Sequence, residues 1–117
     1  MKKIVVIDDD LGILEAVKVV LELEGYEVIA LIKFEGIKEI SELKPHLILL
    51  DVLLPGIDGR VIARELKKSK LCKDIPIIMF SASSNLEKTT KDSGVDGFIA
   101  KPFDISQLLK AVETHIA

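Results

Sequence analysis

The sequence has very little cysteine. Cys72 stands alone, so no disulfide can form within the chain and a reducing compartment is its natural setting. The sequence also lacks any apolar run close to the roughly 20 residues that a membrane span requires. The apolar residues 4–7 are followed at once by three aspartates, which makes them too short for the core of a signal peptide. These absences lead us to expect a cytoplasmic protein with no membrane contact.

A basic run is missing as well. The 117 residues carry 16 Lys and Arg against 19 Asp and Glu, and the two signs are mixed along the chain. Nucleic acid held by charge needs a basic patch, so we expect no direct binding to nucleic acid. With 49% apolar residues, the chain is long enough to bury a real core as one domain over residues 1–117.

Short continuous apolar runs recur along the chain, as is typical of strands buried on both faces of a parallel sheet. They lie at residues 4–7, 28–32, 47–50, 75–80 and 98–100. The segments between them carry helical signals. Three of these signals are apolar stripes: one from Ile13 to Leu21, before Gly25, one within residues 34–43, and one from Val61 to Leu66 after the candidate cap Asp58. Two more are capping-box spacings, at Ser84 with Glu87 and at Asp104 with Gln107. Strand and helix alternate five times, which predicts an α/β fold with helices on both faces of a parallel sheet.

Polar residues follow four of these runs. Asp8, Asp9 and Asp10 follow the first run, Asp51 follows residues 47–50, and the last two runs are followed by Ser81 and Lys101. Because the carboxyl ends of parallel strands form one edge of the sheet, we expect these side chains to meet there. A helix cap explains Asp58, and Asp10 is either a cap or an outer contact of a metal site. No cap explains Asp51, which follows four buried apolar residues.

The chemistry of such a cluster follows from its charge. Carboxylates held close together need a cation or a proton, and Mg²⁺ prefers oxygen ligands of this kind. A carboxylate beside Mg²⁺ can attack phosphorus and form an acyl phosphate, with an ammonium group neutralising the transferring oxygens. The residue types therefore point to phosphoryl transfer onto Asp51, with Lys101 as counter-charge and Ser81 as a hydrogen-bond donor.

The sequence resembles the receiver domain of bacterial response regulators over essentially its whole length. The matching stretches are IVVIDDD from residue 4, LLDVLLPGIDG from residue 49, IIMFSA from residue 77 and GFIAKPF from residue 97. The resemblance implies a flavodoxin-like doubly wound (βα)5 sandwich with a five-stranded parallel sheet of order 2-1-3-4-5. It also implies that Asp51 is the phosphoacceptor, loaded from a phosphohistidine on a sensor kinase or a histidine phosphotransfer protein.

The resemblance further assigns roles to the neighbours of Asp51. Asp8, Asp9, Asp51 and the backbone carbonyl of Leu53 would hold Mg²⁺, or alternatively Mn²⁺. Ser81 and Phe98 would be the switch pair, with a Phe98 ring that moves by packing because it lacks a tyrosine hydroxyl. Lys101 would contact the phosphoryl group, and its bond to Pro102 is expected to be cis.

The resemblance also implies a mode of action. The protein would be a switch and not a turnover enzyme, and Leu53 and Ser83 predict slow autodephosphorylation because neither positions a water well. We expect no output segment after Ala117, and therefore expect output through a surface within residues 86–116 that binds a protein effector. The protein would be a monomer or a weak phosphorylation-dependent dimer. A stand-alone regulator, a phosphorelay intermediate and a receiver cut from a larger protein all fit this sequence. On the first predicted helix, Ile13 or Leu14 is a candidate contact for the phosphodonor.

Three other functions compete with this interpretation. A phosphatase of the haloacid dehalogenase type matches Asp8 and Asp10, but Gly12 departs from its pattern and Asp51 would have no role. A flavodoxin-like flavin binder needs a phosphate loop where this chain has three aspartates, which would repel phosphate. A phosphorylation-independent interaction module would not need the full set of site residues.

Overall fold

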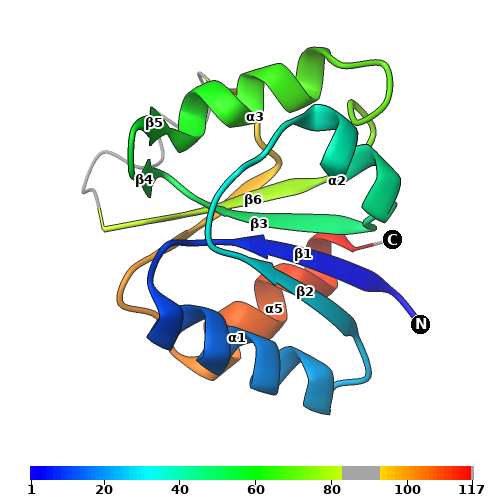
Figure 1. The fold of residues 1–117 in the computed structure, drawn as a ribbon. Coiled ribbons are helices and arrows are strands. Elements are labelled where there is room, and N and C mark those ends of the chain that lie inside the picture. The colour runs from blue at the N-terminus through cyan, green and yellow to red at the C-terminus, as the bar shows by residue number, and fades with distance from the viewer. Residues whose placement is uncertain (83–92, 117) are drawn as a thin grey trace.

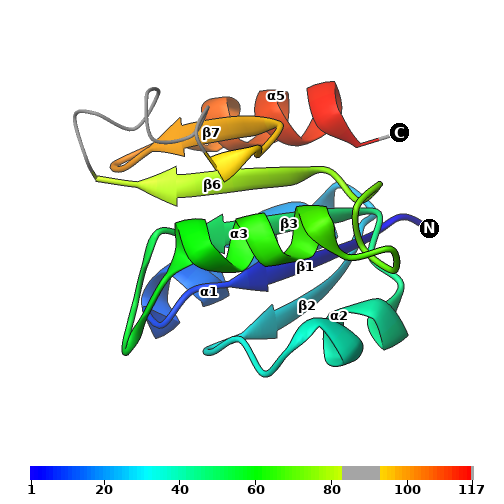
Figure 2. The ribbon, with the colours of Figure 1, turned by 90° about the horizontal axis from the view of Figure 1, so that it is seen from above.

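A computed structural model describes residues 1–82 and 93–116. Its centre is a parallel sheet of five strands with the order β2-β1-β3-β6-β7, and Figure 2 shows these strands side by side. The strands are β1 (Lys3–Ile7), β2 (Glu27–Leu31), β3 (Leu47–Asp51), β6 (Ile77–Ser81) and β7 (Gly97–Ala100). The predicted α/β fold and the 2-1-3-4-5 order are both confirmed.

Helices cover both faces of this sheet. The helices α1 (Leu11–Leu23) and α5 (Ile105–His115) lie on one face, and α2 (Ile37–Leu43) and α3 (Gly59–Lys68) lie on the other (Figure 1). Successive strand residues point to opposite faces, so Ile4 and Val6 join the core beneath α1 and α5, while Val5 and Ile7 join the core beneath α2 and α3. Every residue of β3 is buried, because this strand is central and covered on both faces.

The predicted helix caps are present where the structure describes them. Asp10 accepts hydrogen bonds from the first turn of α1, and Asp58 accepts one from Arg60 in α3. Asp104 and Gln107 form the complete capping box of α5. The helix predicted from Ser84 and Glu87 lies outside the described residues.

Two elements begin later along the chain than the sequence predicts. The helix expected over residues 34–43 begins only at Ile37, because Gly36 has φ of 127°, which a helix cannot include. The strand expected from residue 75 begins at Ile77, since the Ile75 amide closes a turn onto the Cys72 carbonyl. The segment between β3 and α3 contains a small antiparallel hairpin of β4 (Leu53–Leu54) and β5 (Ile57–Asp58), which the sequence did not predict.

Among the described residues, no helix is both long and apolar enough to cross a membrane.

Candidate functional site

The polar residues that follow the strands meet at one edge of the sheet, as predicted. Asp8 follows β1 and is fully buried, while Asp51 and Ser81 are the last residues of β3 and β6 and are 5% and 3% exposed. Lys101 follows β7 directly. The parallel register explains the meeting, because Asp51 lies opposite Phe80, the residue before Ser81, and Ser81 lies opposite Ala100, the residue before Lys101.

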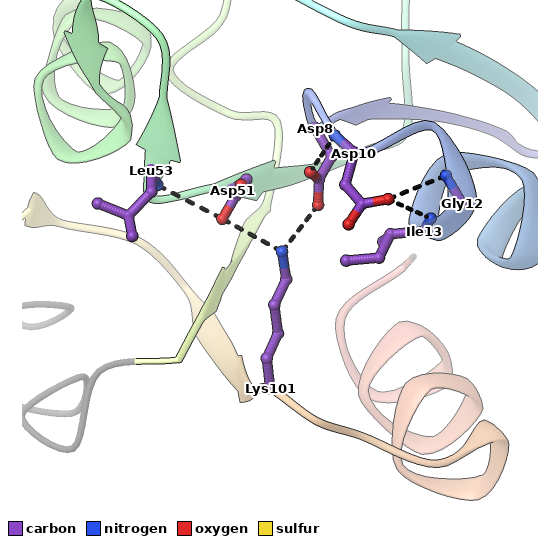
Figure 3. Close-up of polar contacts among 7 residues, drawn as sticks. All are labelled: Asp8, Asp10, Gly12, Ile13, Asp51, Leu53 and Lys101. Carbon is purple, nitrogen blue, oxygen red and sulfur yellow. Dashed lines mark hydrogen bonds and ion pairs between the residues drawn. The ribbon is translucent and has the colours of Figure 1, made fainter.

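The ammonium group of Lys101 lies between two of these carboxylates. Its Nζ is 2.9 Å from Oδ2 of Asp8 and 3.4 Å from Oδ1 of Asp51, as drawn in Figure 3. The backbone amide of Lys101 donates to the Ser81 carbonyl at 2.8 Å, which continues the pairing of β6 and β7. The Lys101–Pro102 peptide bond is cis, as the resemblance implies. The sheet edge thus holds a cation against two buried acids.

Burial raises the pKa of the Asp51 carboxyl above its ordinary value, and the nearby charge of Asp8 raises it further. The Lys101 ammonium and the Leu53 amide act in the opposite direction and do not fully compensate. The ionised form of Asp51 is therefore short of positive charge, and a second cation near it would stabilise the site.

Three carboxylates are arranged so that such a cation can bind. One oxygen each from Asp8, Asp9 and Asp51 lies within 4.8 Å of the other two. Oxygens on opposite sides of an octahedral Mg²⁺ ion lie about 4.2 Å apart, so the cluster is close to the required span. Asp9 is exposed, which leaves this side of the cluster open to solvent. The residues present fit a small divalent cation with oxygen ligands.

Asp10, for which the sequence left two roles open, is the N-cap of α1. Its Oδ1 accepts from the amides of Gly12 at 2.9 Å and Ile13 at 3.2 Å (Figure 3). Its own amide donates to Oδ1 of Asp8 at 3.0 Å. The start of α1 therefore helps to orient Asp8, while the Asp10 carboxylate is used as a helix cap.

The two residues predicted to form a switch lie in adjacent strands. Ser81 is buried at the end of β6, whereas the Phe98 side chain in β7 is 41% exposed. Leu53, whose carbonyl was a predicted metal ligand, begins the β4–β5 hairpin and donates its amide to Oδ1 of Asp51 at 3.4 Å. The roles of these three residues remain predictions.

The sequence reasoning missed an aromatic pair beneath Lys101. The rings of Phe80 and Phe103 stack with centroids 5.2 Å apart, and the Lys101 Nζ lies 5.8 Å from the Phe80 centroid. A cation at this distance from a ring face is attracted to it. The signal was present, since each phenylalanine lies one or two residues from a polar residue of the site, but only the pairing of β6 with β7 brings them together.

The single cysteine and the two histidines make structural contacts. Cys72 is buried, which raises the pKa of its thiol. His46 accepts a hydrogen bond from the Lys3 amide, and the ring nitrogens of His115 lie 2.8 Å and 3.0 Å from the carbonyls of Ala111 and Asp96.

The fold and the site together define a class: flavodoxin-like α/β domains that gather acids and a lysine at the carboxyl edge of the sheet. Residues 4–113 match the family model of the response regulator receiver domain. The chain belongs to this family.

Two curated relatives match nearly the whole of this chain in sequence. The DNA-binding dual master transcriptional regulator RpaA of Synechocystis is 36% identical over 117 residues, covering 96% of this chain and 48% of the relative. The phosphate regulon regulator PhoB of Pseudomonas aeruginosa is 40% identical, covering 95% of this chain and 51% of the relative. The chain thus spans about half the length of these curated relatives.

Solved structures show the same fold. The chemotaxis protein CheY4 of Vibrio cholerae has a TM-score of 0.89 at 26% identity, with 99% of each chain covered. A CheY-like receiver domain protein of Methanospirillum hungatei has a TM-score of 0.87 at 32% identity, with 97% of this chain and 92% of that chain covered. The receiver domain of the sensor histidine kinase PA1611 of Pseudomonas aeruginosa, solved with magnesium in its active site cleft, has a TM-score of 0.86 at 21% identity, with 97% of this chain and 96% of that chain covered.

Proposed function

We propose that Asp51 accepts a phosphoryl group from a phosphohistidine of a sensor kinase or a histidine phosphotransfer protein, and that this event switches a protein-binding surface. The observation that carries the proposal is the position of Asp51. Its buried carboxylate faces the Lys101 ammonium and shares a candidate cation site with Asp8 and Asp9. Residues 1–117 would act as one receiver unit in the cytoplasm.

The transfer needs few groups. A carboxylate oxygen of Asp51 forms a bond to phosphorus while the bond from phosphorus to the donor's imidazole nitrogen breaks. The electron pair leaves with that nitrogen, which then takes up a proton. Lys101 neutralises charge on the transferring oxygens, and the Ser81 hydroxyl donates to one of them. Asp51 is consumed in each event, so the protein is a stoichiometric acceptor and not a turnover catalyst.

Asp8, Asp9, Asp51 and the Leu53 carbonyl are the groups that would hold Mg²⁺, or Mn²⁺ in its place. When bound, the ion supplies charge neutralisation for the phosphoryl oxygens. Support comes from the mutual distances of the three carboxylates and from the PA1611 receiver, which has magnesium in its active site cleft.

Phosphorylation would place a group with a charge of roughly −1.5 to −2 at Asp51, where the carboxylate has −1, and the switch would transmit this local change to the surface. In this proposal Ser81 turns toward the phosphoryl group and the exposed ring of Phe98 moves inward. The effector would then bind within residues 86–116, of which the structure describes β7, α5 and their connection. The phosphodonor would contact α1, where Leu14 is buried and Ile13 is the more accessible of the two candidates.

Autodephosphorylation would be slow in the absence of partners. Leu53 is apolar and 72% exposed, so its side chain cannot hydrogen-bond an attacking water. Ser83, the other residue expected to act here, lies outside the described residues. A phosphoryl half-life of seconds in the isolated protein would contradict this part of the proposal.

The experiment is labelling with acetyl phosphate and Mg²⁺, followed by intact-mass spectrometry. The wild type should gain one phosphoryl group and Asp51→Ala none, while Asp74→Ala, which removes an exposed acid in the turn before β6, should label like the wild type. Equal labelling of wild type and Asp51→Ala, or labelling of neither, would overturn the proposal. Repeated turnover of a phosphate monoester would indicate the phosphatase alternative instead.

A further inference from the structure

The first residue of α3 lies against the backbone at the end of β3. A Cβ atom on Gly59 would lie 2.2 Å from the carbonyl oxygen of Asp51 and 2.9 Å from Cα of Val52. Real Cβ atoms essentially never approach other atoms closer than 3.0 Å, and the obstructing atoms here are backbone, which cannot rotate away. Gly59 is not among the residues with positive φ, so space and not backbone conformation demands a glycine.

The same contact closes the loop that carries part of the site. The Gly59 amide donates to the Val52 carbonyl at 2.7 Å, and the Val52 amide donates to the Phe80 carbonyl at 3.0 Å. Between these two residues the β4–β5 hairpin pairs Leu53 with Asp58. The loop over residues 52–59 is therefore anchored at its base to the sheet and to α3 at once, directly beside Asp51.

We infer that Gly59 is a positioning residue for phosphoryl transfer: by having no side chain it lets α3 lie on the Asp51–Val52 backbone, which sets the position of the Asp51 carboxylate and of the Leu53 carbonyl. Adding a Cβ must move α3 and β3 apart by at least about 0.8 Å, the difference between the 2.2 Å separation and the 3.0 Å limit. A displacement of roughly 1 Å at reacting groups can cost about a hundredfold in rate. The inference rests on the proposed function, in which the Asp51 carboxylate accepts the phosphoryl group and the Leu53 carbonyl helps to hold the cation.

The first test compares Gly59→Ala with Gly97→Ala. The control also crowds its surroundings, because a Cβ on Gly97 would lie 2.8 Å from Cε1 of His115, but it does so at the amino end of β7, away from Asp51. Folding is followed by circular dichroism, Mg²⁺ affinity by calorimetry without a phosphodonor, and labelling by acetyl phosphate at saturating Mg²⁺. A folded Gly59→Ala should bind Mg²⁺ at least about tenfold more weakly and label about 10- to 100-fold more slowly, with the control near wild type.

A folded Gly59→Ala with Mg²⁺ affinity and labelling rate within threefold of wild type would overturn the inference. Loss of both properties to the same extent in Gly97→Ala would also overturn it, because general destabilisation would then explain the result.

A second measurement uses the wild type alone and covers the case in which Gly59→Ala does not fold. The Gly59 amide should exchange with solvent at least about a hundredfold more slowly than in an unstructured peptide, and Mg²⁺ should slow it further. Exchange that is unprotected, or unaffected by Mg²⁺, would count against the positioning role. If the wild type takes no label at all, the proposed function fails, and Mg²⁺ affinity and amide exchange still decide the role of Gly59.

Discussion

The Nζ of Lys101 lies 2.9 Å from Oδ2 of Asp8, a side chain with no solvent exposure. A buried carboxylate that loses its ionic partner is strongly destabilising, whereas an exposed pair contributes little. The Lys101 side chain is only 18% exposed, so the pair is close to the buried case.

Replacing Lys101 by methionine should lower the free energy of unfolding by about 1 to 3 kcal/mol in metal-free buffer, because Asp8 is left buried without a cation. Urea denaturation at pH 7 measures this change. Mg²⁺ should restore part of the loss, since it supplies positive charge to the same carboxylates. The control is Lys33→Met, whose ammonium is paired only at the surface and whose loss should change stability by less than about 0.5 kcal/mol. A Lys101→Met protein as stable as wild type would contradict the prediction.

The raised pKa of Asp51 predicts a pH-dependent cost to stability. The folded protein binds a proton at Asp51 more tightly than the unfolded chain does, so stability falls as pH rises from the ordinary value of 3.8 through the folded pKa. Asp51→Asn removes this cost and should be more stable than wild type at pH 7 in metal-free buffer. The advantage should shrink as pH falls toward 3.8. Denaturation curves across this range, with Asp74→Asn as control, measure it, and an advantage independent of pH would count against the assignment.

Phe80→Leu should slow labelling by acetyl phosphate about two- to fivefold, because the ring that attracts the Lys101 ammonium is lost and such contacts contribute about 0.5 to 1 kcal/mol. The matched control is Ile78→Val, in the same strand and the same core cluster but away from Lys101. This variant should lose about 1 kcal/mol of stability with an unchanged labelling rate. If both variants label alike, the aromatic contact has no part in placing Lys101.

Cys72 should react with a thiol reagent only when the protein opens. Its side chain is 1% exposed and burial raises its pKa, so thiolate is scarce and inaccessible in the folded state. The reaction with Ellman's reagent should be at least about a hundredfold slower in native buffer than in concentrated guanidinium. Immediate stoichiometric reaction of the folded protein would show that the region around α2 and α3 is more open than described.

The sequence predicted the fold well because its signals are local. Continuous apolar runs distinguish strands covered on both faces, and capping aspartates mark helix starts within one turn. The same locality explains the misplaced boundaries: the apolar stripe within residues 34–43 is helical in pattern, but the conformation of Gly36 excludes the first residues. The hairpin of β4 and β5 was missed because two-residue strands have no periodicity to detect.

For the site, the sequence by itself determined which chemical groups follow each strand, since residue type and position along the chain are both properties of the linear sequence. Only the tertiary structure decided how they face one another. Lys101 and Asp8 are 93 residues apart in sequence, and their 2.9 Å contact depends on the strand order and register of the whole sheet. The stacking of Phe80 on Phe103 and the close approach of Gly59 to Asp51 were likewise decided there, because packing distances of a few tenths of an ångström arise from many distant residues at once.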